Sequence, residues 1–265
     1  MPLSIVRAME TLQVDRSDGV VTVTLDRPER KNAINDVMWD ELLATFRAIA
    51  ANADHDRVVV ITGAGGAFCS GADIGGGAAA DGNALAHMRH VGDVCASLHD
   101  IPQPTIAKVG GVAAGAGLNL ALGCDLVVAS DEARFSEIFA RRGLSVDFGG
   151  SWVLPRLVGL HKAKELVLLA DIIGAKEAME IGIVNRVVPA SELDAFVDDW
   201  ARRLAQGPPI ALGLSKKLLD QSSAVSLAQA LEAEAQAQSL NFTTNDTAEA
   251  MLAFVEKRDP RFRGR

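Results

Sequence analysis

The sequence predicts an α/β fold followed by a helical region, and three observations support this prediction. Strand-like runs, loops and helical patterns alternate up to about residue 190, as they do in layered α/β folds. The rest of the chain carries successive amphipathic helical patterns. With 265 residues, of which 49% are hydrophobic, the chain is long enough to bury a large core without disulfide or metal support.

The N-terminal part predicts a hairpin, a helix and a buried strand. Residues 13–18 and 20–25 are strand-like runs joined at an Asp-Gly pair, which is a strong hairpin signal. Residues 36–51 place apolar side chains at helical spacing. Residues 58–62 form the short apolar run that is typical of a buried strand.

The middle of the chain alternates glycine-rich loops with strands and helices. After a glycine-rich loop at residues 63–77, residues 81–98 predict a helix and residues 105–109 a strand. Residues 110–123 form a small-residue segment that turns into a helix, and residues 126–129 predict another buried strand. This order of elements underlies the α/β prediction.

The last part of the chain predicts helices only. Gly207, Pro208 and Pro209 mark a joint within it. The amphipathic segments lie near residues 161–170, 176–181, 192–206, 208–221, 225–242 and 246–257.

Composition and charge narrow the classes of function. Aromatic residues make up 5% of the chain and tyrosine is absent, so we expect an aliphatic, closely packed core. A net charge of −8 argues against binding to nucleic acid or to an acidic membrane surface, because both require a basic face. It still permits an anionic small ligand held by a few local cations.

The cysteines and the N-terminus predict a cytoplasmic protein. Cys69, Cys95 and Cys124 are odd in number and form no CxxC pair, as expected for reduced intracellular thiols. The N-terminus carries no secretory apolar run. The most apolar stretch, residues 110–130, contains Asn119 and Asp125 and is therefore a poor membrane span.

Two glycine-rich elements each follow a strand. The first contains AFCSGADI at residues 67–74, where glycine allows a backbone N–H to point into a cavity, although a plain turn would look the same. The second, residues 110–120, opens a helix and could bind an anion or simply allow close packing. Two such amides in one chain together indicate an oxyanion hole of the kind that stabilises a thioester enolate.

Four motifs follow one another along the chain: LDRPERKNA at residues 25–33, AFCSGADI at 67–74, KVGGVAAGAGLNLALGCD at 108–125 and AFVEKR at 253–258. Together they resemble the crotonase superfamily, also called the enoyl-CoA hydratase/isomerase superfamily. The resemblance covers essentially the whole chain. It implies a spiral of ββα turns over residues 1–200 and a helical oligomerisation region over residues 201–265.

The resemblance also implies the ligand and the assembly. The ligand would be an acyl-CoA thioester whose carbonyl oxygen lies between the backbone amides of Ala72 and Ala116. No cofactor beyond the CoA moiety of the substrate is implied, and no metal, nucleic acid or membrane. The assembly would be a homotrimer or a dimer of trimers.

Both glutamates of the superfamily's hydratases are replaced in this chain. Their positions hold Asn119 and Phe139. Hydration needs one group that activates water and another that handles the α-proton, and neither residue can do either task. The standard hydratase mechanism is therefore not expected.

A later motif implies an isomerase. The pattern GLxxDxGGxWxLPR at residues 143–156, together with Asn119, resembles the 1,2-epoxyphenylacetyl-CoA isomerase type, and dienoyl-CoA isomerases also place an aspartate at this position. Asp147 would carry a proton between the α and γ carbons of the acyl chain, with Phe139, Phe148 and Trp152 as apolar walls that raise its pKa. A structural role as a turn residue is the alternative.

Two further polar residues accompany Asp147. Glu137 lies two residues before Phe139 and is the second candidate carboxylate, with a structural or solvated role as its alternative. Asn119 would orient water, bond an acyl oxygen, or only satisfy a buried helix backbone.

The resemblance further implies residues that contact CoA. Cations would come from Arg27, Arg30 and Lys31, with Phe254 and Lys257 approaching from a neighbouring subunit. Without the resemblance these cations would be assigned to a solvated turn and a helix end. The remaining implied contacts lie in the first two motifs at Ala33, Ser70, Ala72, Asp73 and Ile74.

Two other readings of the chain stay open. A hydratase could use Glu137 or Asp147 in a non-standard arrangement, and a non-catalytic protein could bind acyl-CoA in the same pocket. His87 and His90 lack a third ligand nearby and are expected at the surface or an interface. Cys69 has no His–Asp partner pattern that would make it a nucleophile.

Overall fold

The computed structural model describes residues 9–73, 75 and 83–265. In this part of the chain, six strands form the main sheet in the order β1-β2-β3-β4-β6-β9. The hairpin strands β1 and β2 are antiparallel and all other neighbours are parallel. The strands are β1 (Leu12–Ser17), β2 (Val20–Leu25), β3 (Val58–Gly63), β4 (Thr105–Val109), β6 (Leu126–Ser130) and β9 (Arg186–Val188).

A small second sheet lies beside the main one. Its order is β5-β7-β8, from β5 (Val112–Ala114), β7 (Arg134–Ser136) and β8 (Ile173–Gly174). The chain runs from β4 through β5 into helix α3 (Ala116–Leu122), and from β6 through β7 towards helix α4 (Gly150–Leu169). Each turn therefore places one strand in each sheet and then a helix, which is the predicted ββα spiral.

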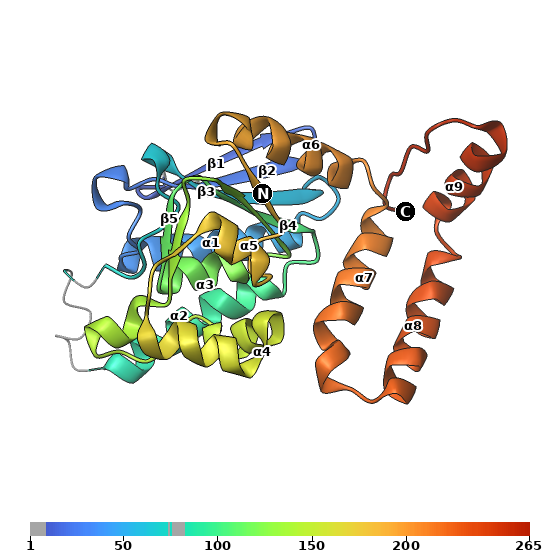
Figure 1. Ribbon diagram of the computed structural model, residues 1–265. Coiled ribbons are helices and arrows are strands. Elements are labelled where there is room, and N and C mark those ends of the chain that lie inside the picture. The colour runs from blue at the N-terminus through green and yellow to red at the C-terminus, as the bar shows by residue number, and fades with distance from the viewer. Residues whose placement is uncertain (1–8, 74, 76–82) are drawn as a thin grey trace.

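Helices cover both faces of the main sheet (Figure 1). Helices α1 (Asp36–Ala51), α2 (Ala84–His99) and α3 lie on one side, and α6 (Leu193–Ala205) lies on the other. Alternate residues of β3 point to opposite faces, so Ile61 joins the large core under α1 and α3 while Val60 joins a smaller core under α6. A sheet buried on both faces explains the continuous apolar run of β3.

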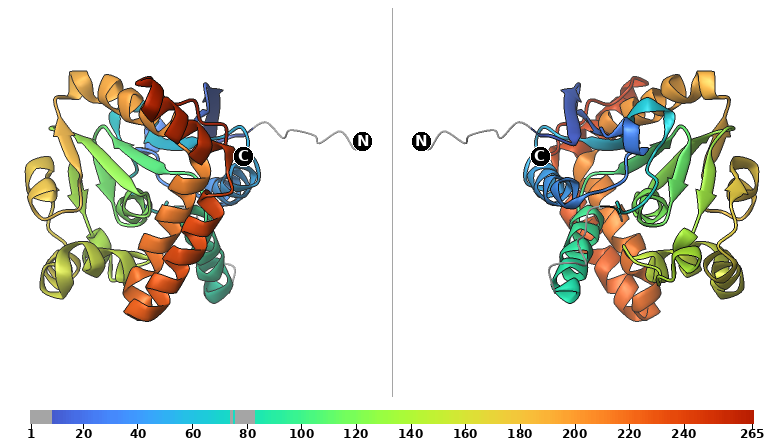
Figure 2. Two further views of the ribbon diagram at one scale, coloured as in Figure 1. Left: turned by 90° about the vertical axis from the view of Figure 1, so that its right-hand side faces the viewer. Right: turned by 90° about the vertical axis from the view of Figure 1, so that its left-hand side faces the viewer.

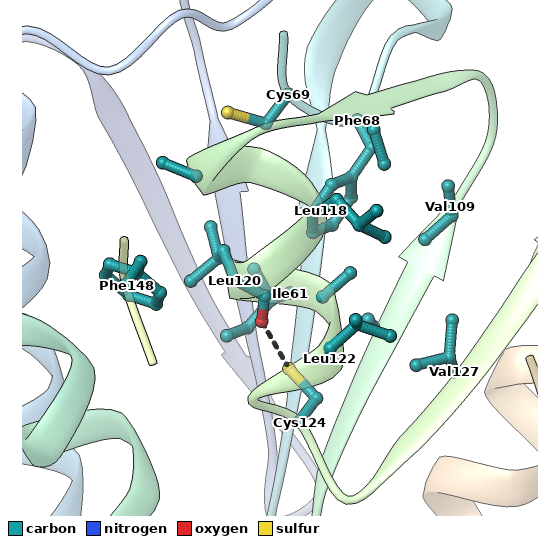
Figure 3. Packing of buried hydrophobic residues seen from close by; sticks show 14 of the residues in the cluster. Ile61, Phe68, Cys69, Val109, Leu118, Leu120, Leu122, Cys124, Val127 and Phe148 are labelled. Carbon is teal, nitrogen blue, oxygen red and sulfur yellow. Dashed lines mark hydrogen bonds between the residues drawn. The ribbon is translucent and has the colours of Figure 1, made fainter. Parts of the chain in front are cut away.

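The large core is mostly aliphatic, as the composition predicts. Figure 3 shows Leu118, Leu120 and Leu122 of α3 packed among side chains of the sheet and of the neighbouring loops. All seven residues of α3 are buried. A polar side chain on this helix, such as Asn119, therefore has to find its hydrogen-bond partners inside the protein.

The C-terminal helices lie to one side of the α/β layers (Figures 1 and 2). They are α7 (Pro209–Gln221), α8 (Leu227–Asn241) and α9 (Asn245–Glu256). The predicted boundary between residues 200 and 201 falls inside α6, which packs on the sheet as one unit. The predicted joint at Gly207, Pro208 and Pro209 lies where α6 ends and α7 begins.

The shorter elements complete the description. Helix α5 (Ala175–Glu180) precedes β9. The single 3-10 turns are η1 (Pro28–Arg30), η2 (Ala64–Gly66), η3 (Ile138–Arg142), η4 (Ala190–Glu192) and η5 (Ser222–Ala224). No helix in the described part of the chain combines the length and hydropathy needed to cross a bilayer.

One expectation about elements needs correction, four short strands were missed, and one predicted helix start cannot be compared. Helix α4 begins at Gly150 rather than near residue 161, and it is broken at Gly159, where φ is +75° and ψ 161°. The strands β5, β7, β8 and β9 were not predicted, because two or three residues carry no readable alternation. Helix α2 is described from Ala84 onwards, and the earlier start predicted at residue 81 lies outside the described residues.

Candidate active site

The two glycine-rich elements meet beside the small sheet. The first loop pairs with the second element through an isolated bridge between Cys69 and Ala113. A Cβ on Gly117 would lie 2.7 Å from the Cβ and Sγ of Cys69, so this close approach requires glycine. In the first loop, a Cβ on Gly71 would lie 3.8 Å from the amide nitrogen of Ala116 in the second element. The two loops are thus in direct contact.

Both amides predicted to bind the thioester oxygen are available. Ile34 donates to the carbonyl of Gly71 and accepts from the amide of Asp73, so the amide of Ala72 between them points to the other side. Ala116 is the first residue of α3, where an amide has no partner within the helix. Within the described residues neither amide donates a hydrogen bond. Their part in binding a substrate stays a prediction.

Asn119 lies one helical turn after Ala116 and joins two acidic residues. Its Nδ2 donates to the backbone oxygen of Asp147 at 2.9 Å and lies 3.5 Å from Oε2 of Glu137. The side chain is completely buried. Because a Cβ at Gly150 would collide with the Asn119 amide group, this glycine makes the space for that contact. Asn119 therefore has a structural role in holding the Asp147 segment.

The neighbouring aromatic residues anchor the Asp147 segment. Phe148 adopts φ +46°, which is rare for a side chain of this size, and its ring stacks on Trp39 with centroids 5.5 Å apart. Phe148 and Phe139 are buried, as expected for walls of the site. Trp152, the third predicted wall, is 42% exposed and lines the outer part of the cavity described below.

Both carboxyl groups have raised pKa values. Burial raises the pKa of the Glu137 carboxyl to about 8, the hydrogen bond from Asn119 opposes this rise, and the nearby Asp147 carboxylate adds to it. Burial raises the pKa of Asp147 to about 6. At pH 7 these values leave Glu137 mostly protonated and Asp147 mostly ionised. Acid–base residues with pKa values near neutrality are typical of active sites.

Three oxygen atoms of this cluster are buried and unpartnered. They are Oδ1 of Asn119, Oε1 of Glu137 and Oδ1 of Asp147, none of which has a hydrogen-bond partner within the described residues. Such atoms are uncommon in folded proteins, and each requires an explanation. Their concentration around Asn119 indicates a place where a ligand supplies the missing partners.

A cavity of about 740 Å³ opens next to this cluster. It reaches from Asn119 and Phe148 past Cys95 and Trp152 to Leu219 of α7. The walls thus come from helices far apart in sequence. Neither Cys95 nor Leu219 could be placed at the cavity from the sequence, because both lie on helices whose packing cannot be derived from periodicity alone.

An ion pair links the two loops that are predicted to contact CoA. Arg27 lies 3.0 Å from the Asp73 carboxylate and also donates to the carbonyl of Ala33 at 2.6 Å. The Arg27 guanidinium lowers the pKa of Asp73. Arg27 and Asp73 therefore hold the loops together, while Arg30 and Lys31 are exposed cations.

The other predicted contact residues lie in different places. Ser70 donates from its hydroxyl to the Arg30 carbonyl at 3.2 Å, and Ile74 lies outside the described residues. Phe254 is 84% exposed on α9 and Lys257 ends that helix. In the part of the chain that the structure describes, neither lines the cavity.

Neither the two histidines nor the cysteine singled out from the sequence adds a reactive group to this site. His87 and His90 lie 3.7 Å and 2.9 Å from carboxylates of α1. The described residues contain no cluster of three or more side chains suited to holding a metal ion. Burial raises the pKa of Cys69 to about 12, so its thiol is not a nucleophile near neutral pH.

Comparison with known proteins identifies the family. The family model for enoyl-CoA hydratase/isomerase matches residues 15–265. The chain belongs to the enoyl-CoA hydratase/isomerase family. This match includes all four motifs, and the spiral fold with its C-terminal helices is confirmed.

Relatives within this enoyl-CoA hydratase/isomerase family carry two kinds of name. The "Probable enoyl-CoA hydratase" of Rhodobacter capsulatus is 40% identical, with 96% of this chain and 98% of the relative covered. The 1,2-epoxyphenylacetyl-CoA isomerase of Escherichia coli is 36% identical, with 97% and 100% covered. The solved enoyl-CoA hydratase of Bacillus anthracis superposes with a TM-score of 0.92 at 33% identity, covering 97% and 100%. Membership therefore does not choose between hydration and isomerisation.

Proposed function

We propose that this chain is an acyl-CoA isomerase that moves a double bond, or rearranges a ring-bearing acyl group, with Asp147 as the proton-carrying residue. The observation that carries the proposal is the link between Asp147 and the amide of Ala116. Asn119, one helical turn from Ala116, donates to the backbone of Asp147 at 2.9 Å. A base is thereby fixed close to the position expected for the thioester.

The two free amides supply the electrostatic part of the reaction. When a base removes an α-proton, negative charge moves to the thioester oxygen. Amides of Ala72 and Ala116 that have no other partner in the described chain can donate to this oxygen without first breaking a hydrogen bond. This arrangement lowers the barrier to the enolate.

The electrostatics of Asp147 suit proton transfer in both directions. Burial raises its pKa from 3.8 to about 6, so it is ionised at pH 7 and can still return a proton. We therefore expect the isomerisation rate to rise with pH through about 6. One relative, of Escherichia coli, is named 1,2-epoxyphenylacetyl-CoA isomerase, which supports this choice, whereas other relatives are named hydratases.

Hydration is the second candidate, and one observation favours it. Glu137 provides a second buried carboxyl group within 3.5 Å of Asn119. However, Phe139 and Asn119 occupy the positions of the usual glutamates, so we expect only slow hydration of crotonyl-CoA.

The CoA moiety and the assembly complete the proposal. Arg30 and Lys31 would meet the phosphates, and Phe254 and Lys257 would approach from another subunit. Support comes from the exposed apolar side chains of Phe254 and Leu252 on α9, which suit burial in a trimer or a dimer of trimers.

Exchange of the α-proton with solvent tests the proposal. The purified protein is incubated with a 3-enoyl-CoA in D₂O, and deuterium uptake and double-bond position are followed by NMR. Isomerisation with α-exchange supports the proposal. Binding without exchange would instead assign the chain to non-catalytic acyl-CoA binding, and hydration that outpaces isomerisation would assign it to the hydratases.

A further inference from the structure

The geometry points to Glu137 as a second proton-carrying group of this site, whose carboxylic acid donates a proton to the acyl chain while the Asp147 carboxylate accepts one. This role rests on the proposed function and deepens it. A single carboxylate suffices for isomerisation if it returns the proton that it removes. The structure instead places a second carboxyl group, that of Glu137, 3.5 Å from the same Asn119 amide that donates to the backbone oxygen of Asp147.

The Glu137 side chain is too deeply buried to be a solvated surface carboxylate. Its side chain is 1% exposed, and it leaves Oε1 without a hydrogen-bond partner among the described residues. Its other oxygen, Oε2, has only the long 3.5 Å contact with Asn119. An ionised carboxylate would need far better hydrogen bonding at such a depth. A neutral carboxylic acid fits this environment, and it has a proton to donate.

The groups that face Glu137 leave it protonated beside an ionised partner. Asn119 faces it from α3, and the carboxylate of Asp147 approaches from the segment before α4. Cys95 of α2 is the next titratable group, close to Asp147, and burial raises its thiol pKa to about 11. No cation contacts Glu137 in the described part of the chain. The pKa of about 8 for Glu137 agrees with this arrangement.

The resulting step is balanced in protons and electrons. The C–H bond at the α carbon breaks, its proton goes to Asp147, and its electron pair enters a dienolate held by the two amides. A new C–H bond forms at the γ carbon from that pair and the proton of Glu137. Asp147 is then protonated and Glu137 is ionised. Asp147 releases its proton to solvent and Glu137 takes one up from solvent, which restores the site.

A labelling experiment separates this mechanism from a single shuttle. A 3-enoyl-CoA deuterated at its α carbon is converted in H₂O under single-turnover conditions, with enzyme in excess. In the wild-type product we expect hydrogen at the γ carbon, because Glu137 supplies it. In Glu137→Gln we expect isomerisation about 10- to 100-fold slower, with deuterium now delivered to the γ carbon by Asp147. If this variant does not isomerise but still exchanges the α-deuterium, Glu137 is likewise identified as the donor.

Other outcomes would overturn the inference. Deuterium at the γ carbon of the wild-type product would show a single shuttle. So would a Glu137→Gln variant whose rate and labelling match the wild type. Loss of both exchange and isomerisation in a Glu137→Gln variant with wild-type thermal stability would make Glu137 the base rather than the donor.

Controls keep this inference distinct from the proposed function. Asp56→Asn removes a different buried carboxylate, which pairs with Arg16. Asp56 lies just before β3, at the end of that strand away from the first glycine-rich loop. It should leave the labelling unchanged. If Asp147→Asn keeps α-exchange, the proposed function fails. If Asp147→Asn abolishes exchange while Glu137→Gln behaves as wild type, only the role of Glu137 fails. The pH–rate profile adds a second readout. Loss of the Glu137 proton should lower the wild-type rate above about pH 8, and Glu137→Gln should not show this decline.

Discussion

The buried Glu137 carboxyl should make the stability of the protein fall as the pH rises, and Glu137→Gln should remove this dependence. The folded chain keeps a proton on Glu137 up to about pH 8, whereas the unfolded chain releases it near 4.5. Between these values the unfolded state binds fewer protons, so each pH unit lowers the free energy of unfolding by about 1.4 kcal/mol. From pH 6 to pH 8 the loss amounts to about 2 kcal/mol, and it levels off above about pH 9.

Denaturant unfolding measures this difference directly. Urea titrations followed by the fluorescence of the three tryptophans at pH 6 and at pH 9 give the free energy of unfolding of both proteins. Because the unfolded chain already ionises near pH 4.5, we expect Glu137→Gln to be more stable than wild type by about 2 kcal/mol at pH 6, and this difference to grow by about 3 kcal/mol at pH 9. Asp147→Asn is the matched comparison, and its smaller effect should already be complete near pH 6. Parallel stability curves for wild type and Glu137→Gln between pH 6 and pH 9 would refute the assignment of a neutral, buried Glu137.

Four other substitutions test the packing around Asn119, the missing hydratase residues and a partly buried ion pair. Gly150→Ala should displace Asn119 and lower the isomerisation rate at least about 10-fold, so an unchanged rate would disprove the positioning role of that contact. Asn119→Glu together with Phe139→Glu should raise crotonyl-CoA hydration above wild type, whereas Asn119→Glu alone should not, and steady-state kinetics decide between these outcomes. Lys216→Met should lower the free energy of unfolding by about 3 kcal/mol, because Lys216 lies 2.9 Å from Asp125 and is only 10% exposed. Equal urea midpoints for this variant and the wild type would contradict that estimate.

Long elements with regular patterns were readable from the sequence. The helix at residues 36–51 and the strands at 20–25 and 105–109 match α1, β2 and β4 in the structure. In each, the apolar period and the flanking turn residues agree with the final packing. The two-residue strand β8 could not be read, because its pairing is decided by its partner β7 and not by its own side chains.

The candidate site was readable only in part. Motif resemblance located Ala72, Ala116 and Asp147, and the structure places them around the first turn of α3 and its contacts. Sequence spacing could not show that Asn119 joins Asp147 to Glu137, since that contact depends on Gly150 allowing the close approach of α4. Long-range contacts of this kind follow from the packing of whole elements.

The pairing of Arg27 with Asp73 shows the same limit. Both residues belong to motifs implied to contact CoA, and both are charged. The structure shows that Arg27 and Asp73 form an ion pair that joins two loops. A sequence reveals which charges exist but not which of them neutralise each other, so the free cations Arg30 and Lys31 could not be told from Arg27 in advance.

The rate of isomerisation by Asp147→Asn is the most direct measurement of the central claim. Asparagine keeps the shape of the side chain but cannot accept a proton, so the substitution separates chemistry from folding. With a 3-enoyl-CoA substrate we expect a loss on the order of 10²–10⁴ in kcat. Affinity for the acyl-CoA, measured by calorimetry, should change little because the amides of Ala72 and Ala116 are unaltered. A variant that isomerises at the wild-type rate would contradict the claim that Asp147 carries the proton.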